Sequence, residues 1–282
     1  MAPPARPPPG LHFDPGFLTA RDRSAIAAWL ATSHPIREQR FSDLRPPPRG
    51  QDQRPLLRPV IWLGGWQFAC LDYYHPPDGA LGRVVRADPY PPALQTVVDR
   101  AEARIRSQFR GPDLPKRWRL NTCLVNLYGS WVGDDGKRTD TARVGDHRDY
   151  EPGPIASISL GERGLFQFVT PGGRREPVKQ VWLTDGSLVT FGGPYWKDRV
   201  LHRVQRVDHT GRRLDVPYPG FETRRVNITF RWVPEEHIAE FASLPLSSRD
   251  DVRGYVAELA RQSPHWEAAL RAEAATPAQR PE

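Results

Sequence analysis

The chain has 282 residues and a mass of 32.0 kDa, with 38% hydrophobic and 26% charged side chains. This composition is sufficient for a core and excludes a disordered polyelectrolyte. No apolar run approaches the roughly 18 residues of a membrane span, and the Pro-rich start is not expected to be a signal peptide. The net charge of +7, with 36 arginines and 4 lysines, favours a nucleic-acid partner. A compositional bias toward Arg and Pro explains the imbalance equally well.

Two cysteines, Cys70 and Cys123, are too few for a disulfide framework or a four-thiolate zinc site. We therefore expect a reducing, cytoplasmic environment. The length is compatible with one decorated domain, since single all-β domains often reach about 250 residues.

The N-terminal part is predicted to be helical. Residues 1–12 are expected to form a flexible Pro-rich arm. Within 13–119, a first helix is predicted at 18–31, with Thr19 as its N-cap. A second is predicted at 93–109, where apolar residues follow the i, i+3, i+4, i+7 spacing most clearly.

After residue 120 the period of the apolar residues changes to two, which is typical of strands. The predicted strands are 120–128, 155–160, 164–169, 180–183, 187–191, 200–207 and 224–233. Seven short strands without intervening helices predict an antiparallel sandwich or barrel, with its core at 120–240. A helical tail at 241–282, with a helix at 249–261, completes a single domain.

The last predicted strand carries polar and apolar side chains on opposite faces, because successive side chains alternate. Its apolar set is Val226, Ile228, Phe230 and Trp232, and its polar set is Arg225, Asn227, Thr229 and Arg231. The apolar face indicates sheet packing. The two arginines on the polar face are unusual, but alone they favour a face that is simply exposed to solvent.

A possible metal site begins at His147 and Asp149, which project to the same side of an extended segment. Such a pair can chelate one ion, and a second histidine completes a 2-His-1-carboxylate set that leaves positions open on Fe(II). His202 is the candidate because its surroundings are apolar and strand-like. His209 follows in a turn and is expected to be solvated.

Asn126 and Tyr128 form a further i, i+2 pair on one face of a strand. In chain order the motifs N-x-Y, H-x-D, His and R-x5-R together resemble the AlkB family of Fe(II)/2-oxoglutarate dioxygenases. The stretches IASISLG at 155–161 and RVNITFR at 225–231 agree with this resemblance. The likeness is good over about 120–233 and weak upstream.

The resemblance implies a mainly β fold with flanking helices and a double-stranded β-helix, or jelly roll, at its core. It implies Fe(II) as the metal, with 2-oxoglutarate and O2 as cosubstrates. The implied iron ligands are His147, Asp149 and His202. The implied 2-oxoglutarate residues are Arg225 at the C5 carboxylate, assisted by Asn126 and Tyr128, and Arg231 near the C1 carboxylate. Two charge-assisted bonds from one arginine suit such a carboxylate.

For the substrate, the resemblance implies a flipped nucleobase held by aromatic side chains. The expected substrate-binding residues are Trp66, Tyr73, Glu151 and Arg174. Two departures from the family pattern stand against a nucleobase. Only Glu151 represents the acidic pair that usually follows H-x-D, and residues 129–146 form a longer connection than the repair enzymes have.

The expected activity is therefore oxidative dealkylation of N-alkylated bases in DNA or RNA, with release of succinate, CO2 and formaldehyde, as in DNA repair demethylases. The expected partner is alkylated DNA or RNA, and the expected state is a monomer that does not contact a membrane. The alternative is a hydroxylase or demethylase of a protein or small molecule that uses the same iron centre.

Overall fold

The protein is described by a computed structural model that covers residues 8–207 and 212–275; His209, expected to be solvated, lies outside these ranges. Its long helices are α1 (Ala20–Ala31), α2 (Pro92–Gln108), α3 (Leu246–Ala260) and α4 (Pro264–Ala275). Its strands are β1 (Leu11–Asp14), β2 (Val60–Leu63), β3 (Gly65–Trp66), β4 (Val84–Arg86), β5 (Thr122–Val132), β6 (Arg138–Asp140), β7 (Val144–His147), β8 (Ile155–Gly161), β9 (Gly164–Val169), β10 (Pro177–Leu183), β11 (Leu188–Phe191), β12 (Leu201–Val207), β13 (Phe221–Arg231) and β14 (Ile238–Ala239). No helix among the described residues is long and apolar enough to cross a membrane.

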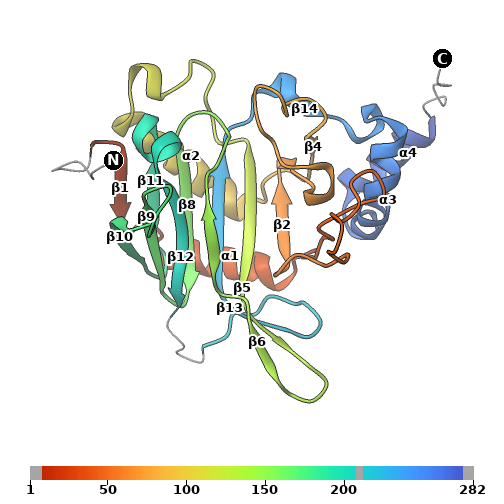
Figure 1. Cartoon of the computed structure of the whole chain (residues 1–282), viewed down its shortest axis with the longest axis horizontal. Helices are drawn as coiled ribbons and strands as arrows, with labels where there is room; N and C mark the ends of the chain where they lie inside the picture. The colour runs from red at the N-terminus through yellow and green to blue at the C-terminus, as the bar shows by residue number, and fades with distance from the viewer. Residues whose placement is uncertain (1–7, 208–211, 276–282) are drawn as a thin grey trace.

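Two antiparallel sheets form the core (Figure 1). The major sheet has the order β1-β11-β8-β13-β5-β2, with β6 added to β5, and the minor sheet has the order β10-β9-β12-β7. After β7 the chain crosses repeatedly between the sheets, from β7 to β8, β8 to β9, β10 to β11, β11 to β12 and β12 to β13, whereas β9 and β10 are neighbours within the minor sheet. This arrangement confirms the predicted jelly-roll core with flanking helices.

Helices α1 and α2 cover the outer face of the major sheet (Figure 1). The predicted N-cap of α1 is confirmed, because Thr19 accepts a hydrogen bond from the backbone of Asp22, whose side chain bonds back to Thr19. The buried face of α2 consists of Leu94, Val97, Val98, Ala101 and Ile105. Burial of each larger side chain in this set contributes about 1.5–3 kcal/mol.

The sequence did not reveal the two strands that close the ends of the major sheet. β1 pairs with β11, so the predicted N-terminal arm ends in a strand rather than in a flexible segment. β2 pairs with β5 and directly follows residues 46–59, which are rich in proline. Both strands have only four residues, which is the lower limit at which strand periodicity can be recognised. The long connection at 129–146 also gains structure, because β5 extends into it and pairs with β6.

A second apolar core lies between β2, β3 and the C-terminal helices, and it encloses one carboxylate. Glu38 accepts hydrogen bonds from the indole nitrogens of Trp62 (3.3 Å) and Trp66 (3.0 Å) and from the backbone of Ala69 (2.7 Å). Burial raises the pKa of Glu38 to about 7, although these three donors act to lower it. This acid therefore fixes the segment after β3 to β2.

We expect Glu38 to make stability depend on pH. The pKa of Glu38 in the folded state lies above its ordinary value of 4.5. The stabilisation that the protonated side chain gives to the folded state is therefore fully present below about pH 4.5, and it is lost as pH rises through about 7. The free energy of unfolding should change by about 3 kcal/mol over this range, because one pKa unit corresponds to about 1.36 kcal/mol. Denaturant unfolding of the Glu38→Gln variant should show lower stability overall and a flatter dependence between pH 5 and pH 8. The exposed Glu258→Gln variant is the control, and an unchanged pH profile in Glu38→Gln would contradict the assignment.

Candidate metal centre and cavity

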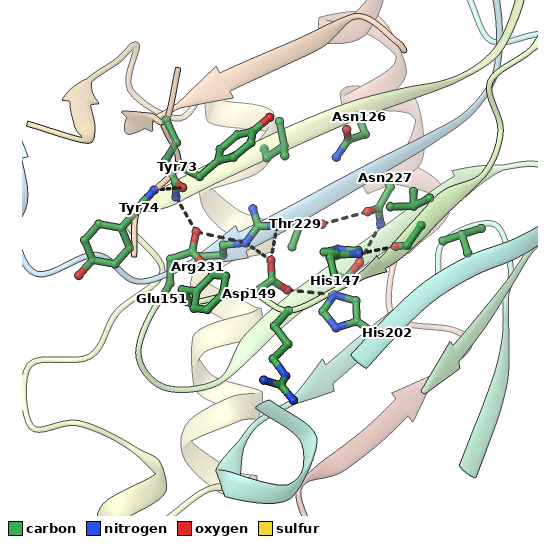
Figure 2. A pocket seen from close by; sticks show the side chains of 18 of the residues that line it. Tyr73, Tyr74, Asn126, His147, Asp149, Glu151, His202, Asn227, Thr229 and Arg231 are labelled. Atoms are coloured by element: carbon green, nitrogen blue, oxygen red, sulfur yellow. Dashed lines mark hydrogen bonds and ion pairs between the residues drawn. The ribbon is translucent and has the colours of Figure 1, made fainter. Parts of the chain in front are cut away.

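Three side chains with metal-binding atoms converge at the inner edge of the minor sheet (Figure 2). His147 ends β7 and pairs in register with His202 of the neighbouring strand β12. Asp149 follows two residues later, so it projects to the same side. One ligand atom from each residue lies within 4.8 Å of the others. The structure thus brings together the three residues that were predicted to bind a metal.

The hydrogen bond of His147 prepares its ring for a metal. Its Nδ1 lies 2.8 Å from the carbonyl oxygen of Gly145 and donates to it, which leaves the lone pair on Nε2. Burial, and then the neighbouring ring of His202, lower the pKa of His147 to about 4. The ring is therefore neutral near pH 7, as a metal ligand must be.

Asp149 is held by an arginine on the opposite sheet. The Nε and Nη2 atoms of Arg231, the last residue of β13, lie 2.9 and 2.8 Å from Oδ1 of Asp149. The other carboxylate oxygen, Oδ2, lies 3.2 Å from Nε2 of His202. Although burial acts to raise the pKa of Asp149, Arg231 and His202 hold it well below its ordinary value. One oxygen is thus fixed by the arginine and the other faces the histidines.

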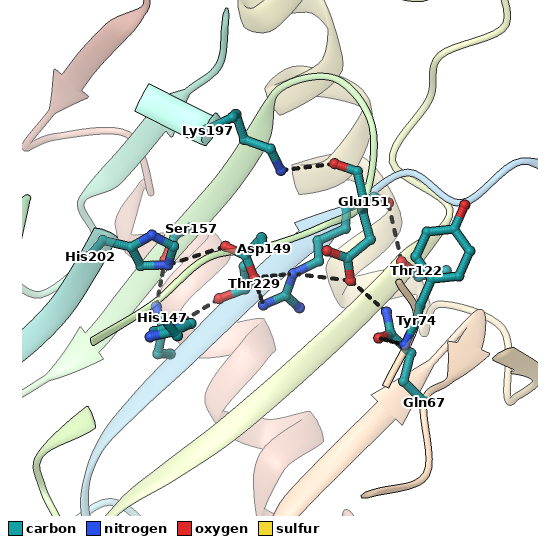
Figure 3. Close-up of polar contacts among 12 residues, drawn as sticks. Gln67, Tyr74, Thr122, His147, Asp149, Glu151, Ser157, Lys197, His202 and Thr229 are labelled. Atoms are coloured by element: carbon teal, nitrogen blue, oxygen red, sulfur yellow. Dashed lines mark hydrogen bonds and ion pairs between the residues drawn. The ribbon is translucent and has the colours of Figure 1, made fainter. Parts of the chain in front are cut away.

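A chain of buried polar contacts continues from this pair to the segment after β3 (Figure 3). Arg231 also lies 3.5 Å from Oε1 of Glu151, which accepts a hydrogen bond of 2.5 Å from Gln67. Gln67 in turn accepts from the backbone of Tyr74 at 3.3 Å. The backbone carbonyl of Glu151 accepts from Lys197 at 2.8 Å. Glu151, predicted to bind substrate, is therefore occupied by neighbours within the protein.

The predicted polar face of β13 lies inside the sandwich rather than in solvent. Asn227 donates to Ser157 (2.7 Å) and to the carbonyl of Ile158 (2.9 Å), and it accepts from Thr229 (2.9 Å). Asn227, Ser157 and Thr229 all line the cavity. The interpretation of this face as simply solvated is therefore wrong, because the minor sheet covers it.

Arg225 lies on the same face and is 1% exposed. Its Nη2 donates to Ser159 at 3.0 Å, whereas its buried Nε and Nη1 have no hydrogen-bond partner. The ring of Tyr128, which lines the cavity, lies 4.7 Å from its guanidinium. Burial lowers the pKa of Arg225. Buried N–H groups without partners are costly, so this position fits a carboxylate that comes from a ligand.

The three candidate metal-binding residues, His147, Asp149 and His202, line a cavity of about 530 Å³. Asn126 and Tyr128 line it, and so does Tyr73, one of the predicted substrate residues (Figure 2). A cavity of this size lies within the range of about 300–1,000 Å³ that is typical of small-molecule sites.

Two predicted substrate residues lie elsewhere. Trp66 is 2% exposed, stacks on Phe68 with ring centroids 4.4 Å apart, and has its edge contact with Trp266. Its ring is therefore part of the second core and does not line the cavity. Arg174 is exposed at the turn between β9 and β10 and does not line the cavity. Aromatic type and spacing did not distinguish a core tryptophan from one that faces the cavity.

Several residues that line the cavity were missed in the sequence. They are Arg40, Arg58, His75, Arg148 and Tyr150. Tyr150 is 50% exposed and its ring centroid lies 4.3 Å from that of His75. Arg148 and Tyr150 adjoin the H-x-D motif and could have been considered on that ground, whereas no motif marks the other three.

The residues present fit Fe(II) and 2-oxoglutarate. Two histidines and a carboxylate form a donor set suited to Fe(II), and the two unpartnered nitrogens of Arg225 suit the distal carboxylate of the cosubstrate. A buried arginine with no acid beside it would otherwise be a costly charge.

Comparison with known families agrees with this chemistry. Residues 10–231 match the model of the 2OG-Fe(II) oxygenase superfamily, and the chain belongs to that family. It is therefore a dioxygenase that uses Fe(II), 2-oxoglutarate and O2. A comparison with curated proteins gave no match.

Two solved structures are similar to this chain. The structure of OsALKBH1 superposes with a TM-score of 0.50 at 21% identity, covering 80% of this chain and 100% of that one. A 2OG-Fe(II) family oxidoreductase from Burkholderia pseudomallei gives a TM-score of 0.42 at 16% identity, covering 78% and 84%. The similarity to OsALKBH1 shows that the fold of the chain is AlkB-like.

We expect the His202→Ala variant to lose metal binding. Loss of a ligand should lower the affinity by more than the roughly 10- to 100-fold that follows from loss of a supporting contact. Anaerobic calorimetric titration with Fe(II) or Mn(II) measures this directly, without turnover. The exposed His34→Ala variant is the control, and unchanged affinity in His202→Ala would show that another residue completes the site.

We expect Arg225→Ala to weaken 2-oxoglutarate binding by about 10- to 150-fold, since a hydrogen bond to a charged group contributes about 1.5–3 kcal/mol. The measurement is the 2-oxoglutarate dissociation constant of the metal-bound protein in the absence of O2. Arg225→Lys keeps the charge without the forked geometry and should recover only part of the affinity. Wild-type affinity in Arg225→Ala would contradict the role of this arginine.

Proposed function

We propose that the enzyme removes alkyl groups from nitrogen atoms of nucleobases in DNA or RNA. One oxygen atom of O2 enters the substrate methyl group, and the other enters succinate as 2-oxoglutarate loses CO2. The N-hydroxymethyl product then releases formaldehyde, and the nitrogen regains its hydrogen. The resemblance of the site motifs to the AlkB family and the AlkB-like fold support this proposal.

The observation that carries the proposal is the aromatic and cationic lining of the cavity above the metal-binding residues. Tyr73, His75 and Tyr150 contribute rings on which a flat base can stack. Arg40 and Arg58 contribute positive charge suited to phosphate. A neutral aliphatic substrate would need neither group.

The roles of the chain's own residues follow from the contacts. His147, Asp149 and His202 would hold the iron, and Arg231 keeps the carboxylate of Asp149 oriented. Arg225 would hold the distal carboxylate of 2-oxoglutarate, with Asn126 and Tyr128 beside it. When bound, the iron and its cosubstrate supply the oxidation of the alkyl C–H bond.

Arg231 differs from its predicted role in one respect. Its Nε and Nη2 atoms are engaged by Asp149. We therefore propose that Arg231 acts on the C1 carboxylate of 2-oxoglutarate only as a neighbouring charge, while its hydrogen bonds orient Asp149. This role makes it a positioning residue.

Tyr73 provides the test of the substrate class. If a base stacks on its ring, Tyr73→Ala should weaken binding of an N-methylated single-stranded oligonucleotide by about 1–3 kcal/mol, and Tyr73→Phe should not. Anaerobic fluorescence anisotropy measures the affinity, and formaldehyde release in air measures the reaction. The 2-oxoglutarate affinity should stay the same in both variants.

A panel of methylated oligonucleotides, nucleosides and peptides separates the two candidate functions. Succinate and formaldehyde release that depends on the oligonucleotide supports dealkylation of bases. Release that depends only on a peptide or metabolite would replace the proposal with the alternative hydroxylase or demethylase activity.

A further inference from the structure

A side chamber of about 330 Å³ adjoins the main cavity. Both are lined by Arg40, Arg58 and Tyr73, so the ring of Tyr73 stands where the two spaces meet. The chamber has one further cation, Arg54, and one acid, Glu38. Its remaining lining is mostly apolar. Three arginines therefore surround a small recess directly beside the proposed base-binding cavity.

The arginines are carried by a segment of defined backbone geometry, residues 36–60, which we call the flap. The backbone of Arg40 donates to the carbonyl of Arg54 at 2.9 Å, and Leu56 donates to Glu38 at 2.7 Å. Ile36 and Val60 exchange two hydrogen bonds of 2.8 Å. These contacts form an irregular ladder that continues β2, so Arg40 and Arg54 are held on neighbouring strands of one structure.

Arg58 is fixed independently of the ladder. Its Nη1 donates to the carbonyl oxygens of Thr141 and Arg143, both at 3.0 Å, and its guanidinium lies 4.6 Å from the ring of Tyr128. The contacts with carbonyls orient the group without neutralising its charge. The flap is attached a second time where Trp131 donates to the carbonyl of Leu57 at 2.8 Å.

The positive charge of the three arginines in the chamber is not neutralised by acidic side chains. Among the described residues, Arg40, Arg54 and Arg58 form no ion pair with a carboxylate. Glu38 is the one acid in the lining, and its oxygens already accept three N–H groups from the core. Burial also raises its pKa to about 7, so it cancels at most part of one positive charge near neutral pH.

We propose that the side chamber is a phosphate-binding subsite, in which Arg40, Arg54 and Arg58 hold a phosphate group of the substrate. Arginine suits this ligand because its planar donors match phosphate oxygens in pairs. Because the two spaces share Tyr73 and other lining residues, a base in the main cavity and a phosphate in the chamber belong to one nucleotide or to neighbouring ones. The inference deepens the proposed function and rests on its base-binding cavity.

The phosphate can come from a polynucleotide or from a free nucleotide, and the same variants test both. The Arg40→Gln/Arg54→Gln double variant removes two charges and keeps Arg58, whose contacts support the backbone. The matched control is Arg21→Gln/Arg261→Gln, which removes two exposed charges outside both cavities. Metal and 2-oxoglutarate affinities serve as folding controls and should be unchanged in both.

The first measurement compares an N-methylated nucleoside with its 5′-monophosphate by anaerobic calorimetry on the metal- and 2-oxoglutarate-bound enzyme. The wild type and the control should bind the monophosphate about tenfold more tightly, the lower end of what hydrogen bonds to a charged group provide. The double variant, which keeps only Arg58 of the three arginines, should lose most of this preference. Equal binding by the wild type would overturn the subsite, whether or not the enzyme dealkylates bases.

The second measurement follows binding of a fluorescein-labelled, N-methylated single strand as salt rises. Each lost phosphate contact should reduce the slope of log affinity against log salt by about 0.7, in the double variant and not in the control. The wild type could prefer the monophosphate, with the double variant largely losing that preference, while no oligonucleotide is dealkylated. This result would assign the subsite to a free nucleotide and would refute the polynucleotide substrate. An oligonucleotide that is dealkylated with the same salt slope and affinity by all three proteins would overturn the subsite alone.

Discussion

The buried ion pair between Arg231 and Asp149 is the contact on which the site depends. It joins the last residue of the central strand β13 to the segment after β7, and so connects the two sheets at the floor of the cavity. Both partners are withdrawn from water, and neither would be tolerated alone. Because Arg231 takes one oxygen of Asp149, the other faces His202. The same arginine contacts Glu151, which extends the constraint to Gln67 and to the segment after β3.

The interior of the sandwich combines an apolar fold with a polar cavity. On the outer side of β13, Val226, Ile228 and Phe230 belong to the core beneath α1 and α2. On the inner side, Asn227 donates a hydrogen bond to Ser157 and accepts one from Thr229. Arg225 is the exception, since two of its buried nitrogens have no partner. A ligand carboxylate would supply the partners that these two nitrogens lack.

Much of the core and the metal site could be predicted because strand alternation is local. The faces of β13 and the i, i+2 spacing of His147 and Asp149 follow from the period of two, and the family motifs supplied the choice of His202. The cavity wall could not be predicted in the same way. Trp66 lies in the second core because Glu38, distant in sequence, accepts a hydrogen bond from its indole. The flap pairs residues 38–40 with 54–56 through an irregular ladder that has no period. Such contacts depend on tertiary structure, so residue type and spacing did not reveal them.

The distribution of charge in the cavity then bears on the kind of substrate. Each carboxylate in the lining has an arginine partner within the protein: Asp146 is paired with Arg203, and Asp149 and Glu151 with Arg231. In contrast, among the described residues Arg40, Arg58 and Arg148 line the same space without an acidic partner, and Nε of Arg148 is buried with no hydrogen bond at all. The acids are thus paired with arginines of the protein itself, whereas these three arginines remain available to a charged ligand. A substrate that carries negative charge beside a flat ring satisfies both this excess and the aromatic lining, whereas a cationic peptide side chain would leave the arginines unpaired and add repulsion.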